Sequence, residues 1–183
     1  MTIDDIVSRI VSLQEELETA YSRRREAFSY ELRNRRAVFD ARAKALHKSL
    51  RMRIPPYIRR ARLSIVLSFP FIAVLIVPIA LLDILVIIYQ AICFPVYGLK
   101  KVPRADFIAL DRAQLGYLNA IEKFNCLYCS YANGVLSWTR EIAGRTESYW
   151  CPIKHARRVE GTHAHYPQFL DYGDAEAWRR AMD

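Results

Sequence analysis

The chain has 183 residues, of which 52% are hydrophobic and 25% charged, and it carries a formal net charge of +8. This composition excludes a disordered protein, and six glycines and eight prolines are too few for an all-β protein. Positive charge is concentrated in residues 1–62, whereas residues 63–98 hold one charged side chain, Asp83. A basic, an apolar and a nearly neutral region in this order are typical of a membrane protein and argue against a soluble globule.

Residues 1–62 are predicted to form a basic amphipathic or coiled-coil helical region. Spacings of three and four residues alternate along a seam of apolar side chains: Ile3, Ile6, Ile10, Leu13 and Leu17. Arginines at 23–25 interrupt this seam, so we expect the helix to bend or pair back on itself there. The seam predicts a homo-oligomer or a partner in a membrane complex. The basic side suits anionic headgroups better than nucleic acid, because no nucleic-acid-binding motif is present and a membrane segment follows; a solvated helix face is the alternative.

Residues 63–98 are predicted to be the membrane segment, since about 20 apolar residues already cross the hydrocarbon. Pro78 divides the segment into two short halves. Basic residues that can bind the membrane surface flank both ends: Arg51, Arg53, Arg59, Arg60, Arg62, Lys100 and Lys101. Positive charge on both sides places both termini in the cytoplasm of a bacterial cell, with a helical hairpin or re-entrant segment in the inner membrane. One tilted span is the alternative.

Asp83 is expected near the turn of this hairpin, where it would cap the second half. The alternative is a functional carboxylate inside the membrane, because such groups are costly there and usually have a purpose.

Residues 99–183 are predicted to form a cytoplasmic helical module that holds a metal. We expect helices over residues 105–131 and 135–147, separated by a turn at Asn133-Gly134, and a short helix near 174–182. Folding the two helices back would bring together four candidate ligands: Cys126, Cys129, Cys151 and His155. His163 or His165 could replace His155 as the fourth ligand. Thiolates and imidazole favour zinc, and iron or an iron–sulfur cluster is the alternative.

Two other interpretations of the cysteines are inert buried thiols and a redox-active pair. The strings NCLYCSYANG and EIAGRTESYWCPIKHA resemble the core of an uncharacterised bacterial membrane-protein family, and this resemblance implies no activity.

The sequence as a whole predicts a mostly α fold. As function we expect a membrane-anchored, metal-binding scaffold or accessory protein of an inner-membrane assembly. A membrane-bound redox or electron-transfer protein is the alternative. A membrane-bound enzyme acting on lipid is disfavoured, because no complete catalytic motif is present.

Overall fold

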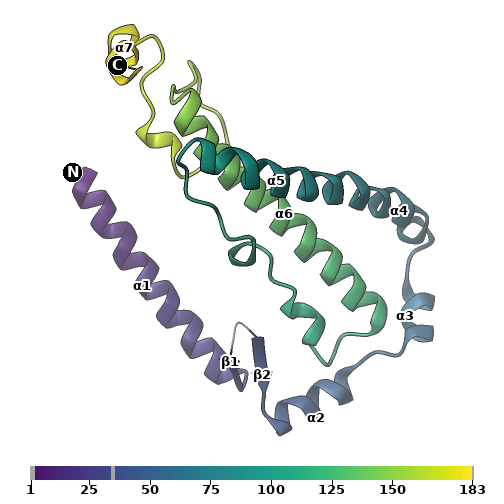
Figure 1. Ribbon diagram of the computed structural model, residues 1–183. Helices are drawn as coiled ribbons and strands as arrows, with labels where there is room; N and C mark the ends of the chain where they lie inside the picture. Colours follow the sequence, from purple (N-terminus) through teal and green to yellow (C-terminus); the bar gives the residue numbers. More distant parts are fainter. Residues whose placement is uncertain (1–2, 34–35, 183) are drawn as a thin grey trace. The chain divides into compact units, whose positions relative to one another are not determined.

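The computed structural model of the protein describes residues 3–33 and 36–182, so the start of the predicted N-terminal region and Asp183 lie outside the described residues. The chain is mostly helical, as predicted (Figure 1). It divides into two compact units, each described here by itself. The first unit comprises residues 1–60 and 111–124, and the second comprises residues 61–110 and 125–183.

The first unit begins with helix α1 (Ile3–Ala27), which ends just after the arginine cluster. Strands β1 (Tyr30–Arg33) and β2 (Arg36–Phe39) follow as an antiparallel pair in which Tyr30 lies opposite Phe39. Ser29, between α1 and β1, has a φ of 54° and redirects the chain. Just after the arginine cluster, where the sequence predicts that the helix bends or pairs back on itself, the helix ends and a two-stranded hairpin follows, because aromatic and β-branched residues favour strands.

Two short helices complete the first part of this unit, α2 (Ala41–Leu50) and α3 (Ile54–Arg60). The side chain of Asp40 caps α2 by accepting a hydrogen bond of 2.6 Å from the backbone N–H of Ala43. The ring of His47 on α2 makes edge contacts with Phe39 and with Tyr117, at centroid distances of 4.7 and 5.0 Å. These rings join the hairpin, α2 and the segment that precedes α6.

The second unit begins with two consecutive apolar helices, α4 (Leu63–Val74) and α5 (Ile76–Val96). Leu75, between them, keeps helical backbone angles of −65° and −15°, so α5 continues in the direction of α4 (Figure 1). Pro78 lies in the first turn of α5, where a missing N–H is tolerated. The hairpin is therefore not confirmed, and Leu63–Val96 is one helix long and apolar enough to cross a membrane.

Residues 99–119 are mostly irregular, with 3₁₀ turns at Arg104–Asp106 and Asp111–Gln114, in place of the expected helical start at residue 105. Helix α6 (Ala120–Trp150) then runs without a break. Its start is a capping box: Asn119 accepts from the N–H of Glu122 at 3.1 Å, and Glu122 accepts from the N–H of Asn119 at 2.8 Å.

The predicted turn at Asn133-Gly134 is wrong, because both residues lie inside α6. Gly134 is required there by a close approach: an added Cβ would lie 2.7 Å from Ile108 Cγ1 and 2.9 Å from the carbonyl oxygen of Phe107. The residues 107–108 thus press directly on the helix backbone.

The core of the second unit joins α5, the irregular segment and α6. Its buried members are Val86, Phe94, Val102, Trp138 and Ile142. After α6 the chain forms a parallel bridge between Ile153 and Leu170, a 3₁₀ turn at Tyr166–Gln168 and helix α7 (Ala175–Met182). This last helix confirms the short C-terminal helix predicted from the sequence.

Candidate membrane-binding surface

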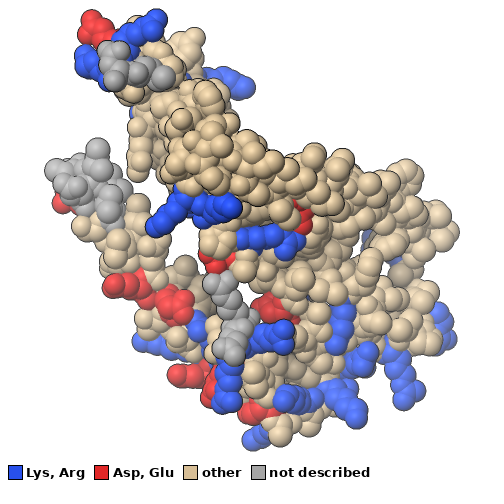
Figure 2. Space-filling model, viewed as in Figure 1, with Lys and Arg blue, Asp and Glu red and all other residues tan. Residues whose placement is uncertain are grey.

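Most of α4 and the outer side of α5 expose large apolar side chains. Figure 2 shows this stretch as an almost unbroken surface without charged atoms. We call it the α4–α5 apolar surface, and it comprises Leu63, Ile65, Val66, Leu67, Phe69, Phe71, Ile72, Val74, Leu75, Val77, Leu81, Ile84, Leu85, Ile87, Ile88, Ile92 and Val96. Soluble monomers rarely expose apolar patches of this extent, which mark a contact with lipid or with another protein.

The inner side of α5 carries three polar side chains, and the second unit provides each of them with a partner. Asp83 binds Arg104 and Tyr131. The hydroxyl of Tyr89 shares a hydrogen bond of 2.9 Å with that of Thr146 on α6. Gln90 Oε1 accepts from the backbone N–H of Val102 at 2.6 Å, so none of the three needs a partner from outside this unit.

Asp83 lies well inside α5 with a side chain that is 8% exposed, which corrects its expected position at a hairpin turn. Arg104 donates from Nε to Oδ1 at 3.0 Å and from Nη2 to Oδ2 at 2.6 Å. Tyr131 donates its hydroxyl to Oδ2 at 2.9 Å. This two-pronged pairing is the strong geometry of an arginine with a carboxylate, and its bond to Asp83 raises the pKa of Arg104. The pair fixes the irregular segment to α5.

Val102 is held by two side chains at once. Its N–H donates to Gln90 and its carbonyl accepts from Trp138 Nε1 at 3.0 Å. Trp138 is 1% exposed and Val102 is 2% exposed. This segment without regular secondary structure can be buried beside α5 because the backbone N–H and carbonyl of Val102 are both hydrogen-bonded.

The outward side of α6 is mixed in chemistry. Its exposed polar side chains are Asn125, Asn133, Ser137 and Arg140, and its exposed large apolar or aromatic ones are Phe124, Leu136, Tyr149 and Trp150. Polar side chains therefore interrupt the apolar exposure on α6, in contrast to the α4–α5 apolar surface.

The seven basic residues predicted to bind the membrane surface are all exposed in the structure. Five lie before α4 along the chain and two follow α5. Exposed cations next to an apolar segment suit anionic headgroups.

The cysteines predicted to bind metal do not come together. Cys126 and Cys129 lie one turn apart on α6, and Cys151 directly follows its last residue. With a rise of 1.5 Å per residue, Cys126 and Cys151 are about 37 Å apart. Cys129 and Cys151 are exposed, and the backbone N–H of the exposed His155 donates to the hydroxyl of Tyr166 at 2.7 Å. Among the described residues, no group of three His, Cys, Asp or Glu is placed to hold a metal ion.

The other two candidate ligands, His163 and His165, bind carboxylates on α6. His163 Nε2 lies 2.8 Å from Glu147, and His165 Nε2 lies 3.1 Å from Glu141. Nδ1 of His163 accepts from the backbone N–H of His165 at 3.2 Å, so the neutral ring must carry its proton on Nε2 and donate it to Glu147. These contacts attach the C-terminal segment to α6.

The contacts of Glu141 displace the pKa of its carboxyl group. Burial alone would raise it, but hydrogen bonds from Arg145 at 2.8 Å and from His165 outweigh burial, so the pKa of Glu141 lies below its ordinary value. Glu141 is therefore charged at neutral pH and accepts hydrogen bonds from both Arg145 and His165.

Sequence reasoning missed Arg104 and Tyr131, although one signal was present: a lone carboxylate in an apolar segment requires a cation from elsewhere in the chain. Comparisons of the chain with protein-family models, with curated proteins and with solved structures give no match.

Proposed function

We propose that this protein is a membrane-attached scaffold or accessory protein whose α4–α5 apolar surface enters the lipid. The observation that carries the proposal is the division of α5 between an exposed apolar side and an inner side whose polar groups are bonded within the second unit. Lipid offers no hydrogen bonds, so a lipid-contacting helix must present such an exterior.

The position of the Asp83–Arg104 ion pair along α5 supports attachment to one leaflet. Asp83 lies 13 residues before Val96, or about 20 Å along α5, and Arg104 would be that deep if α5 stood upright from its C-terminal end. With α5 lying along the interface, Arg104 and α6 remain on the water side. This arrangement also agrees with the basic residues at both ends of the segment, and it would leave both termini in the cytoplasm at the inner membrane.

Leu81 and Ile88, two exposed residues of α5, provide the test. Leu81→Asp combined with Ile88→Asp places two charges on the lipid side, each costing about 2.5–3.5 kcal/mol in the membrane. We expect the variant to move from the membrane pellet to the soluble or aggregated fraction. Leu136→Asp is the matched control, because Leu136 is similarly exposed but lies on α6. Membrane retention of the double variant equal to that of the control would refute the proposed surface.

Attachment from one side is tested separately with epitope tags at both ends. We expect external protease to spare both tags on intact spheroplasts and to remove both after lysis. Removal of one tag from intact spheroplasts would establish a single span instead.

The zinc-binding role stays a prediction. Cys126 and Cys129 can supply two thiolates from one turn of α6, so further ligands would have to come from another part of the molecule or another chain. Elemental analysis of anaerobically purified protein tests it, with the Cys126→Ser, Cys129→Ser variant compared with Cys93→Ser. Equal metal content in these two variants would exclude the cysteine pair as ligands, and visible absorbance would indicate iron in place of zinc.

A further inference from the structure

The N-terminal two thirds of helix α1 carry an exposed stripe of regularly spaced apolar side chains. Every described side chain from Ser8 to Arg24 is exposed, including Ile10, Leu13 and Leu17 at 49%, 55% and 54%. These three continue the seam that positions 3 and 6 begin, and Ala20 is its next member. In water such a stripe favours a second helix.

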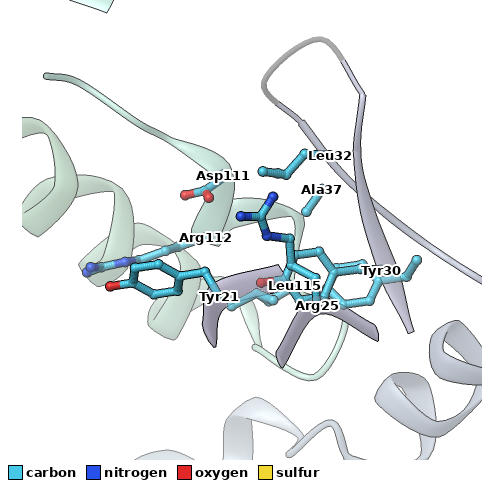
Figure 3. Close-up of a pocket in the computed structure, with 9 residues that line it drawn as sticks. Tyr21, Arg25, Tyr30, Leu32, Ala37, Asp111, Arg112 and Leu115 are labelled. Atoms are coloured by element: carbon cyan, nitrogen blue, oxygen red, sulfur yellow. The ribbon is translucent and has the colours of Figure 1, made fainter. Parts of the chain in front are cut away.

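Near its C-terminal end, α1 faces the rest of its unit with Tyr21 and Arg25. Figure 3 shows Tyr21 and Arg25 beside Tyr30, Leu32 and Leu115, around one hollow. Arg25 also pairs with Glu18 on α1 itself. The part of α1 before Tyr21, residues 3–20, spans about 27 Å, and its described side chains from Ser8 onward are exposed.

We propose that this length pairs with the same length of a second copy of the chain, in antiparallel orientation. The register follows from placing Ile10 against Leu13 of the second copy and Leu13 against its Ile10. Positions 6 and 17 then meet, as do positions 3 and 20. The paired length in each copy contains the whole apolar seam from position 3 to Ala20, and it ends before the arginine cluster.

Charge complementarity selects this orientation. Arg9 and Glu16 occupy equivalent positions beside the seam, one heptad apart. In the antiparallel register, Arg9 of each copy faces Glu16 of the other, so two reciprocal ion pairs flank the central apolar layers. Such flanking charges determine the choice and direction of coiled-coil partners.

A parallel pair lacks these contacts. Arg9 would then face Gln14, and Glu16 would face Tyr21. Arg24, which falls on the seam, would meet Arg24 of the second copy, and like charges opposite each other destabilise such a pair.

The experiment uses charge exchange in the full-length protein in detergent, with two differently tagged versions and co-purification as the readout. Arg9→Glu and Glu16→Arg, each alone, turn both ion pairs into like-charge contacts. We expect each to weaken self-association about tenfold, which corresponds to about 1.4 kcal/mol. Mixing the two variants restores both ion pairs, so the mixed pair should recover wild-type association, as should the protein that carries both substitutions.

Glu15→Arg is the matched control, since Glu15 lies on the far side of the helix from the seam and should leave association unchanged. Circular dichroism checks that every variant keeps its helix content. The proposal is overturned if the wild-type protein is monomeric, since the seam would then have a different partner. It is also overturned if Arg9→Glu and Glu16→Arg have no effect on self-association, or if they weaken it and mixing the two variants does not restore it. Equal loss for Glu15→Arg and Glu16→Arg would also overturn the register.

Discussion

Replacing Asp83 by alanine should be far more damaging than replacing an exposed aspartate that also forms an ion pair. Asp83 accepts three hydrogen bonds, from Arg104 and Tyr131, with an 8% exposed side chain. Breaking a buried ion pair costs about 3–5 kcal/mol. The Arg104 side chain is 41% exposed and regains water when it loses its partner, so we expect a loss of about 2–3 kcal/mol in the free energy of unfolding.

Denaturant titration of the full chain in detergent, followed by tryptophan emission, measures this loss. Trp138 reports on the attachment of the irregular segment, because its Nε1 donates to the carbonyl of Val102. Asp171→Ala is the control: its pair with Lys154 has an 80% exposed carboxylate and should contribute less than about 1 kcal/mol.

A double-mutant cycle separates the pair itself from general damage. Asp83→Ala and Arg104→Ala together should cost less than the sum of the two single changes, by about 1–2 kcal/mol. Additive effects, or a loss for Asp83→Ala no larger than that for Asp171→Ala, would show that the pair does not hold the segment.

Two further predictions concern α6. Gly134→Ala should lower the free energy of unfolding by about 1–3 kcal/mol despite the better helix propensity of alanine, because the new methyl group would meet Ile108 and the backbone of Phe107. As a control, the substitution Asn133→Ala at the exposed neighbouring residue should stay within about 0.5 kcal/mol of wild type in the same titration. Equal effects of the two substitutions would contradict the close approach. Glu141→Gln should cost about 1 kcal/mol at pH 7. Because folding lowers the pKa of Glu141, its stabilising effect is complete above the ordinary value of 4.5 and disappears as the pH falls through the lowered pKa. The stabilities of wild type and variant should therefore converge at acidic pH, and a difference independent of pH would refute the assignment.

The apolar segment shows how far composition alone reaches. Its length and lack of charge predict a helix that can enter a membrane, and the structure has that helix. Pro78 does not reverse the chain. It lacks the N–H that would bond to the last turn of α4, but its fixed φ suits the first turn of α5. The sequence marks the break, but the direction after the break depends on the backbone angles of Leu75.

Gly134 shows why the course of the chain between Cys126 and Cys151 could not be predicted from spacing. Asn-Gly is typical of turns, and a turn there would have folded Cys151 back toward Cys126. A glycine inside a helix serves equally well where another segment approaches closely, and the residues that approach, 107 and 108, lie 26 or more positions earlier in the chain. Local pattern does not distinguish these two uses of glycine.

The N-terminal region illustrates a third limit. The seam of α1 is visible as periodicity, and its helix is present. The local signals for the hairpin that follows α1 are weaker than this periodicity: Tyr30 and Phe39 favour strands, and Asp40 favours the start of a helix. The absence of proline and glycine from this region favours a continuous helix, although it only permits a helix and does not require one.

The order in which the chain is synthesised gives the Asp83 contacts a consequence for biogenesis. Arg104 follows Asp83 by 21 residues and Tyr131 follows it by 48, so α5 is translated before either donor exists. A nascent chain ending at residue 103 would contain the entire apolar helix and neither side chain that bonds to its carboxylate. The step at which α5 settles against its own second unit is therefore delayed until α6 has been translated, and a truncated product would expose an unpartnered acid on its most apolar helix.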